Sequence, residues 1–378
     1  MEFRDLKKQY QLHKKEINSA IRSVLVEADF IQGKQVRQLE EVLAEYVGAK
    51  YCITCANGTD ALQLALMTWD VGKGDAVFVP DFTFFSSGEV AALAGATPVF
   101  VDIEEVTYNM NPESLETAVK YVIQHTRLRP KVIVAVDLFG QPADYERIRQ
   151  IADRYGLLIL EDGAQGFGGR IGEKRCGSFG DIATTSFFPA KPLGCYGDGG
   201  AVFTNNAEWA ELLCSYRVHG KGKDKYDNIR IGMNSRLDTL QAAILLEKMK
   251  FFDDEIKKCD QAANEYAKQL KDFVKVPIVK EGMYSSWAQY TICFSKNEER
   301  EQAVKNLKEQ NILTAVYYRK PMHRQKAFTR YELDRLDYSI TEKICSHCLS
   351  LPMHPYLDKD DIFKVSKSII QTIEGCTE

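Results

Sequence analysis

Between about residues 51 and 205, short apolar runs rich in β-branched residues alternate with segments whose apolar residues recur at helical spacing. This alternation is typical of a layered α/β domain with a mostly parallel sheet. It predicts seven strands, at Tyr51–Cys55, Ala76–Pro80, Pro98–Asp102, Val132–Asp137, Leu157–Glu161, Ile182–Phe188 and Gly200–Thr204. Helices are expected between several of them, at Ala61–Trp69, Ser86–Ala94 and Ala143–Tyr155.

Helical patterns also flank this region. They predict helices before the sheet at Ile17–Glu27 and Gln35–Tyr46, and after it at Leu237–Phe252 and Asp253–Leu270. From about residue 284 onward we expect strands at Tyr284–Phe294 and Leu313–Tyr318, with helices at Glu298–Gln310 and Lys359–Thr372. The chain therefore divides into a large domain, residues 1–250, and a smaller C-terminal α+β domain, residues 251–378.

Charge and composition exclude several classes of protein. Lys and Arg total 49 against 53 Asp and Glu, so the net charge of −4 provides no basic field for nucleic acid. Apolar runs such as Val132–Leu138 are far shorter than the ~20 residues of a membrane-spanning helix. Ten scattered cysteines and the absence of a signal-peptide pattern favour reduced thiols and a cytoplasmic location.

A lysine in an unusual setting is the strongest local signal. Lys191 follows a predicted buried strand, lies between Pro189 and Pro192 on a stiff loop, and precedes the glycine-dense segment Gly197–Gly200. A single lysine of this kind is most often a solvated surface residue. The functional interpretation depends on its companions.

Two further elements follow predicted strands. Asp162 lies at the carboxyl end of a strand, where open α/β sheets bind ligands, although a helix cap or loop acid is the more common role for a single Asp. Asn57, Gly58 and Thr59 lie between a strand and a helix expected to begin near Ala61, and helix-terminal amides with a Thr hydroxyl form an anion cradle. An N-cap turn without a ligand explains that segment equally well.

Together, the lysine, the acid and the anion cradle resemble a pyridoxal-phosphate site. The chain resembles the DegT/DnrJ/EryC1/StrS sugar aminotransferases, a branch of the fold-type I pyridoxal-phosphate enzymes, over nearly its whole length. The motifs that carry this resemblance are Phe3–Leu6, Asn57–Leu62, Phe82–Phe84, Glu161–Gln165, Ser186–Gly194, Gly232–Asp238 and Pro352–Pro355. The resemblance implies a fold-type I large domain, a pyridoxal 5'-phosphate cofactor and a homodimer with shared active sites.

The resemblance also implies roles for individual residues. Lys191 is expected to form the Schiff base with the cofactor and then to move a proton between cofactor and sugar carbons, which requires a lowered pKa. Asp162 is expected against the pyridine nitrogen, Gln165 at the phenolic oxygen and Phe84 on the ring face, although a core aromatic is the commoner role for a residue like Phe84.

The remaining expected contacts concern phosphate and substrate. Gly58, Thr59 and Ser186 are expected to hold the phosphate, joined by Asn234 of the other subunit. Arg236 is a candidate for an anionic part of the substrate, or else an exposed structural arginine. Tyr317 and Tyr318 lie in the segment that resembles the family's nucleotide-sugar site. In this segment Tyr317 and Arg319 replace the usual histidine and proline, so how the sugar or nucleotide is bound stays open.

Two cysteine clusters are not interpreted as sites, and no metal is expected. Cys345 and Cys348 have a metal-like spacing with no second ligand cluster nearby, so they are interpreted as a buried pair on a helix. Cys52 and Cys55 fall within a predicted strand, whereas redox pairs begin helices.

The sequence thus favours an aminotransferase that moves an amino group from L-glutamate to a nucleotide-linked keto-sugar for surface polysaccharides such as lipopolysaccharide. In Ser186–Gly200 and Leu351–Pro355 the chain resembles enzymes that aminate C3 of UDP-linked 3-keto-N-acetylglucosaminuronate. A dTDP-linked 3- or 4-keto-6-deoxysugar is the alternative acceptor. Lys191 argues against the related dehydratases, which carry histidine there, and a non-catalytic sugar-nucleotide-binding relative is a third possibility. The sugar, the nucleotide, the carbon position and stereochemistry of amination, and the exact oligomer stay open.

Overall fold

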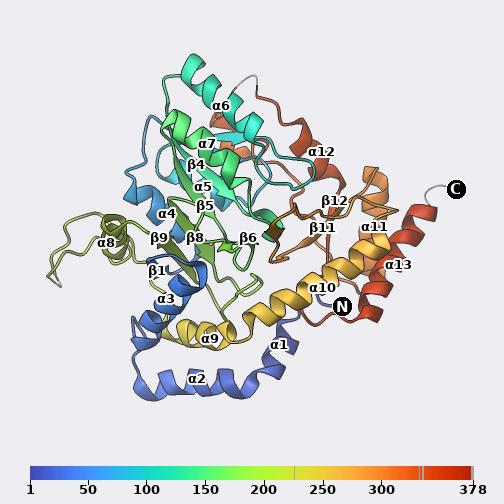
Figure 1. The fold of residues 1–378 in the computed structure, drawn as a ribbon, viewed down its shortest axis with the longest axis horizontal. Helices are drawn as coiled ribbons and strands as arrows, with labels where there is room; N and C mark the ends of the chain where they lie inside the picture. Colours follow the sequence, from blue (N-terminus) through green and yellow to red (C-terminus); the bar gives the residue numbers. More distant parts are fainter. Residues whose placement is uncertain (225, 332, 334–335, 376–378) are drawn as a thin grey trace.

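A seven-stranded sheet is the centre of the structure, a computed structural model that describes residues 1–224, 226–331, 333 and 336–375 (Figure 1). Its strand order is β1-β9-β8-β5-β4-β2-β3, and only the pairs that β9 makes with β1 and β8 are antiparallel. The strands are β1 (Tyr51–Cys55), β2 (Asp75–Pro80), β3 (Thr97–Val101), β4 (Arg129–Val136), β5 (Leu158–Asp162), β8 (Ile182–Ser186) and β9 (Gly200–Thr204). All seven predicted strands and the mostly parallel sheet are confirmed.

Helices cover both faces of the sheet because its strands are apolar on both sides. In β4, Val132 and Val134 pack with α4 (Gly58–Thr68), α5 (Ser86–Leu93) and α8 (Ala207–Tyr216). Ile133 and Ala135 point the other way, toward α6 (Pro112–His125) and α7 (Tyr145–Tyr155). This alternation follows from the two-residue period of a strand and sends neighbouring residues to opposite faces.

The helices before the sheet begin and end at recognisable caps. They are α1 (Leu6–Leu12), α2 (Lys14–Glu27) and α3 (Lys34–Val47). The Asp5 carboxylate accepts the Lys8 N–H at the start of α1, and Gly48 ends α3 in the left-handed conformation. Both α2 and α3 pack against α9 (Thr239–Met249), which closes the sheet near β1 and β9.

The C-terminal part has a hydrophobic cluster of its own. Its helices are α10 (Phe252–Leu270), α11 (Asn297–Glu309), α12 (Ser339–His347) and α13 (Lys359–Gly375), and its sheet pairs β11 (Tyr290–Cys293) with β12 (Cys348–Leu351). The long helix α10 runs from the side of α9 to α13 (Figure 1). The division into two domains near residue 250 is kept as a proposal.

Two strand predictions for the C-terminal part are wrong. Tyr284–Phe294 is not one strand, because β10 (Met283–Tyr284) joins a separate small sheet with β6 (Arg170–Ile171) and β7 (Lys174–Arg175) before β11 begins. Leu313–Tyr318 pairs only through an isolated bridge between Ala315 and Ser350, since its last residues turn to the cavity described below.

The strand that β11 pairs with is instead β12, which begins at Cys348, so Cys345 and Cys348 are not both on a helix. A four-residue apolar run has too little periodicity to separate strand from helix. Two short 3-10 helices, Leu138–Gly140 and Lys326–Tyr331, complete the elements.

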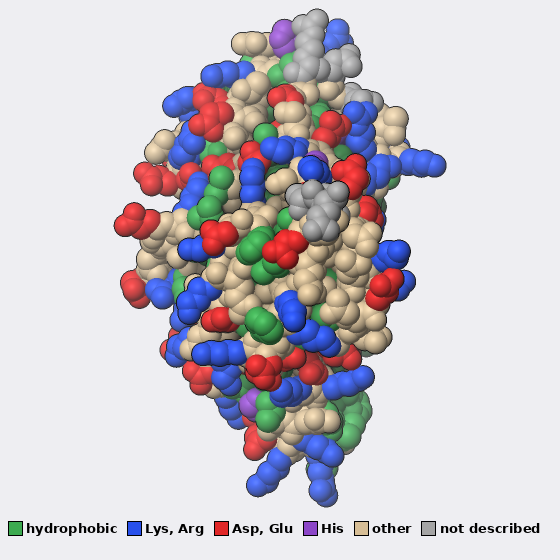
Figure 2. Space-filling model, turned by 90° about the vertical axis from the view of Figure 1, so that its right-hand side faces the viewer, with side chains coloured by type: hydrophobic (Ala, Val, Ile, Leu, Met, Phe, Trp, Pro, Cys, Tyr) green, Lys and Arg blue, Asp and Glu red, His purple; other side chains and the backbone are tan. Residues whose placement is uncertain are grey.

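The outer surface shows no single-sign patch on the face drawn in Figure 2, where Lys and Arg side chains are interspersed with Asp and Glu. This mixture agrees with the near balance of charge in the sequence. None of the helices in the described part of the chain is both long and apolar enough to cross a membrane.

Candidate active site

A cavity of about 430 Å³ lies at the carboxyl ends of β5 and β8, where parallel strands present their last residues and the following loops. Nine residues expected at the site from sequence line it: Gly58, Thr59, Phe84, Asp162, Gln165, Ser186, Lys191, Tyr317 and Tyr318. The fold therefore brings together residues that are up to 260 positions apart in the chain, Gly58 and Tyr318.

Lys191 lies on the loop that follows β8. Its backbone N–H donates to the Phe188 carbonyl at 2.8 Å, which forms a tight turn between the two prolines. Burial lowers the pKa of its ammonium group, Arg4 acts in the same direction, and the nearby Asp162 carboxylate opposes both. A lysine with a lowered pKa spends more time as the free amine, which is the nucleophilic and basic form.

Asp162 is the last residue of β5 and only 5% exposed. Its Oδ2 accepts the Ser87 hydroxyl at 2.7 Å, and its Oδ1 accepts the Ala164 N–H at 3.2 Å. These donors fix the carboxylate on the side of the sheet covered by α5. An anchored carboxylate lining the cavity can stabilise a cation bound within it.

Gln165 is held at both ends of its amide group. Its Oε1 accepts the Phe139 N–H at 2.8 Å, and its Nε2 donates to the Tyr318 hydroxyl at 3.1 Å. The Ser286 hydroxyl also donates to the Gln165 carbonyl at 2.6 Å. Burial raises the pKa of Tyr318, so its hydroxyl stays protonated and remains able to donate into the cavity.

The expected anion cradle is present at the start of α4, which begins at Gly58 rather than near Ala61. The Asn57 side chain accepts the Asp60 N–H at 2.8 Å and so starts the helix three residues early. Among the described residues, no partner is seen for the amides of Gly58 and Thr59. A Cβ at Gly58 would lie 2.7 Å from the Ser186 Cβ, so only glycine allows this close approach of helix and strand.

Two aromatic side chains border the opening. Phe84 is 55% exposed although it lines the cavity, which agrees better with a ligand-facing ring than with a core aromatic. The Tyr317 ring packs edge-on against Phe3, with the centroids 6.1 Å apart, and joins the N-terminal segment to the cavity wall.

Asn234 and Arg236 do not line the cavity of their own chain. Asn234 is exposed, and Arg236 donates to its side-chain oxygen at 2.6 Å. Their placement away from the cavity is what a contribution to the other subunit's site requires. That contribution stays a prediction.

Sequence reasoning missed several residues of the site. These are Ser87, Asp198 and Gln289. Two of them had a local signal, because Ser87 lies at the start of a helix that follows a strand and Asp198 lies in the glycine-dense segment after Lys191. Gln289 lines the cavity from the C-terminal part, and its buried Oε1 has no hydrogen-bond partner within the described part of the chain. No local signal marks Gln289, because only the tertiary fold brings it to the cavity.

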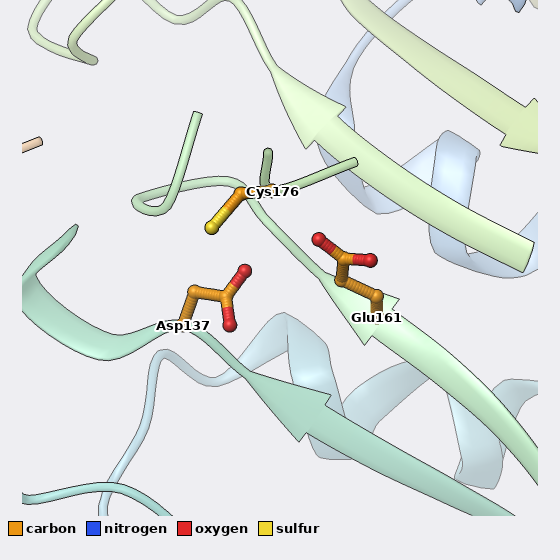
Figure 3. A group of neighbouring side chains, drawn as sticks. All are labelled: Asp137, Glu161 and Cys176. Carbon is orange, nitrogen blue, oxygen red and sulfur yellow. The ribbon is translucent and has the colours of Figure 1, made fainter. Parts of the chain in front are cut away.

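A second cluster lies on the other face of the same strand ends and comprises Asp137, Glu161 and Cys176 (Figure 3). Glu161 accepts the backbone N–H groups of Gly177, Phe179 at 2.7 Å and Gly180 at 3.0 Å. Asp137 uses its Oδ1 for Ala143 and Tyr145, whereas its buried Oδ2 has no hydrogen-bond donor among the described residues.

Burial, and then the charge of Glu161, raise the pKa of Asp137 well above its usual range. We therefore interpret the two carboxyl groups as a pair that holds one proton. Because both Glu161 oxygens already accept N–H groups, the cluster is a closed internal network and not part of the cavity.

The cavity residues fit pyridoxal 5'-phosphate. The free amides of Gly58 and Thr59, with the Ser186 hydroxyl, suit its phosphate. Lys191 and Asp162 supply an amine and an anchored carboxylate in the same cavity. The amine suits the aldehyde of the cofactor, and the carboxylate suits its protonated ring nitrogen.

This fold and this site define a fold-type I aminotransferase. The sequence matches the DegT/DnrJ/EryC1/StrS aminotransferase family over residues 11–370, and the chain belongs to that family.

Relatives of known name and structure agree with this assignment. The chain is 44% identical over 96% of its length to UDP-2-acetamido-2-deoxy-3-oxo-D-glucuronate aminotransferase from Pseudomonas aeruginosa, of which 97% is covered. It is 39% identical over 97% of its length to dTDP-3-amino-3,6-dideoxy-alpha-D-galactopyranose transaminase from Aneurinibacillus thermoaerophilus, of which 98% is covered.

Two solved structures share the fold. One is a family aminotransferase from Brucella abortus, with a TM-score of 0.96, 49% identity and 99% of both chains covered. The other is a Bacillus subtilis protein with bound cofactor PMP, with a TM-score of 0.87 and 31% identity over 96% of this chain and 82% of that one.

Proposed function

We propose that this aminotransferase uses pyridoxal 5'-phosphate to move an amino group from L-glutamate to C3 of UDP-2-acetamido-3-keto-glucuronate. The observation that carries the proposal is the presence of Lys191 and Asp162 in one cavity, beside the anion cradle at Gly58. The similarity to the Pseudomonas aeruginosa enzyme supports the choice of acceptor. The amino sugar produced serves the synthesis of surface polysaccharides.

Each residue of the site then has a defined task. When bound, the cofactor supplies an electron sink for the carbon that loses or gains a proton. Lys191 carries that proton on its Nζ, which its lowered pKa makes possible. Asp162 keeps the ring nitrogen protonated, and the Ser87 hydrogen bond holds this carboxylate in place.

The remaining residues position the ligands. Gly58, Thr59 and Ser186 hold the phosphate, Gln165 and Phe84 orient the ring, and Tyr317 and Tyr318 contact the sugar nucleotide. Asn234 and Arg236 complete the site of the other subunit in a homodimer, Arg236 toward an anionic group of the substrate. Neither residue lines the cavity of its own chain, which supports this arrangement.

The cytoplasm is the proposed location, because the substrates are nucleotide-linked metabolites. All nine cysteines of the described residues are free thiols, which agrees with a reducing compartment.

Assays with glutamate and a panel of UDP- and dTDP-linked 3- and 4-keto sugars test the proposal, with Lys191→Ala as the paired variant. We expect turnover of the UDP-linked glucuronate and a loss of roughly 10⁴-fold or more in Lys191→Ala, because the amine that attacks and moves the proton is gone. Thermal unfolding of both proteins checks that the fold is intact. Retained turnover in Lys191→Ala contradicts the role of Lys191, and activity only on dTDP-linked sugars contradicts the acceptor.

The alternative acceptor, a dTDP-linked 3- or 4-keto-6-deoxysugar, has support in the similarity to the Aneurinibacillus thermoaerophilus enzyme. A non-catalytic sugar-nucleotide-binding role is separated by absorbance. We expect the purified protein to be yellow and to bleach when glutamate is added. A protein that stays colourless after incubation with pyridoxal phosphate supports the binding role.

A further inference from the structure

Two cationic side chains donate hydrogen bonds to the loop that carries Lys191, both to backbone carbonyl groups just after that residue. Arg4 donates from its guanidinium to the Pro192 carbonyl at 3.2 Å. Lys248 donates from its Nζ to the Gly194 carbonyl at 2.6 Å. The two reach this loop from opposite directions in the sequence, one from the segment before α1 and the other from α9.

Burying Lys248 is unfavourable in itself, because its ammonium group loses contact with water. It is 2% exposed, and burial lowers its pKa to about 8, while the charge of Glu255 acts in the opposite direction. Its ammonium also lies 4.4 Å from the centre of the Tyr196 ring. Burying a lysine without a paired carboxylate within contact distance is unfavourable unless its donors are used, and here the main acceptor is a backbone oxygen of the Lys191 loop.

Arg4 both contacts the Lys191 loop and brings a positive charge to it. No carboxylate in the described part of the chain forms an ion pair with it, and its only described side-chain hydrogen bond goes to Pro192. The segment that carries it is tied down by Phe3, whose carbonyl accepts the Met353 N–H and whose ring packs on Tyr317. The positive charge of Arg4 therefore stays close to the Lys191 amine.

We propose that Arg4 and Lys248 are positioning residues of the Lys191 loop, and that Arg4, held at the Pro192 carbonyl of that loop, also places a positive charge beside the Lys191 side chain. The inference rests on the proposed role of Lys191 and adds two residues to it. Neither residue lines the cavity, so both act through the loop. The charges that face Lys191 are Arg4, which lowers its pKa, and Asp162, which raises it.

The test compares Arg4→Gln, Arg4→Lys and Lys248→Met with wild type as full-length enzyme incubated with pyridoxal phosphate. Lys7→Gln and Lys250→Met are the matched controls. Lys7 lies three residues after Arg4 and Lys250 two residues after Lys248, at the C-cap of α9, and both lysines are exposed. For each protein we measure kcat, thermal unfolding, and the pH midpoint of the cofactor absorbance above 400 nm.

Arg4→Gln is expected to raise that pH midpoint by ~1 unit, because a nearby cation no longer disfavours the protonated form, and Arg4→Lys is expected to restore it. Lys248→Met is expected to lower kcat by ~10-fold with an unchanged midpoint, because it only releases the loop. If Lys248→Met does not fold, Lys248→Gln, whose side chain is one bond too short for the same contact, replaces it. The two controls are expected to match wild type.

An Arg4→Gln midpoint equal to that of Lys7→Gln overturns the electrostatic role of Arg4, and an unchanged kcat in the folded Lys248 variant overturns the positioning role of Lys248. Failure of the proposed function looks different. In that case wild type itself develops no absorbance with pyridoxal phosphate, or Lys191→Ala develops the same absorbance as wild type.

Discussion

Glu161 and Asp162 are neighbours at the end of β5, yet they occupy opposite environments. Asp162 lines the cavity and is anchored by Ser87 of α5. Glu161 is fully buried on the other face, where three backbone amides and Asp137 surround it. The strand alternation that sends apolar residues to two faces of the sheet also sends these two carboxylates apart.

The difference shows that one strand end can place a carboxylate that acts on a ligand next to a carboxylate that stabilises the fold. The carboxylate on the cavity side has a face left for a ligand, whereas the oxygens of the inner carboxylate are taken by the loop from Gly177 to Gly180. We therefore expect substitutions on the cavity side to change activity and those on the inner side to change stability. The predictions below run from the largest expected effect to the smallest.

Asp162→Asn is expected to lower kcat by roughly 10³-fold, because it loses the charge that holds the ring nitrogen protonated. Asparagine keeps the shape and both hydrogen bonds, since its oxygen can accept the Ala164 N–H and its NH2 group can donate to the Ser87 hydroxyl. Steady-state kinetics measure this, and thermal unfolding is expected to stay close to wild type. Asp198→Asn, at an exposed acid of the same cavity, is the matched control and is expected to lose less than tenfold. Equal losses in the two variants contradict the assignment of Asp162.

Glu161→Gln is expected to reduce the free energy of unfolding by about 3 kcal/mol, since an amide nitrogen would face a backbone N–H that now has no acceptor. Urea unfolding measures the loss. The kcat per folded molecule is expected to stay within about threefold of wild type. A folded Glu161→Gln enzyme with unchanged stability and impaired kcat reverses the comparison of the two carboxylates.

Asp137→Asn tests whether Asp137 and Glu161 share a proton in the folded chain. The raised pKa of Asp137 means that the folded chain binds more protons than the unfolded chain above the usual pKa of ~3.9. Its contribution to stability is therefore complete at lower pH and is lost as pH rises through the folded pKa. Asparagine does not titrate, so the variant gains stability relative to wild type from about pH 4 upward. Urea unfolding at several pH values checks this, and parallel curves exclude a shared proton.

Ser87→Ala removes a hydroxyl donor from Asp162 and leaves its charge. A single hydrogen bond to a charged group contributes about 1.5 to 3 kcal/mol, but the charge of Asp162 and its second donor, the Ala164 N–H, both remain. We therefore expect only part of this free energy to be lost in kcat, a decrease of ~10-fold or less, with a modest loss of stability. Kinetics and thermal unfolding measure both. Ser23→Ala, on the exposed side of α2, is the control. A loss as large as that of Asp162→Asn indicates that Ser87 itself contacts the ligand.

The sequence predicted the sheet well because each strand is short, apolar and bounded by turns, as at Val132–Val136. It also predicted the cavity residues that stand at strand ends, such as Asp162 and Thr59. These positions follow from one rule, that carboxyl ends of parallel strands meet at one edge of the sheet. The resemblance to a family supplied the roles, which periodicity alone does not contain.

Other parts depend on contacts between distant residues and could not be predicted. The strand that pairs with β11 begins at Cys348, in a run too short to show a period. Gln289 reaches the site, and Arg4 the Lys191 loop, only through tertiary packing. Gln289 stands in no local pattern that signals a site, and Arg4 belongs to the Phe3–Leu6 motif but had no expected role. Arg236 and Asn234 concern a second subunit, so a single chain leaves their role as a prediction.

The contacts of Gln165 have a practical consequence. Its side-chain oxygen accepts the Phe139 N–H, while Ser286 and Tyr318 from the C-terminal part hold its other polar atoms. We expect the Phe139 amide to lose protection when this junction opens, because the Gln165 amide group is then held at one end only. A single peptide that spans Phe139 therefore serves in hydrogen–deuterium exchange as an internal gauge of how firmly the C-terminal part is docked.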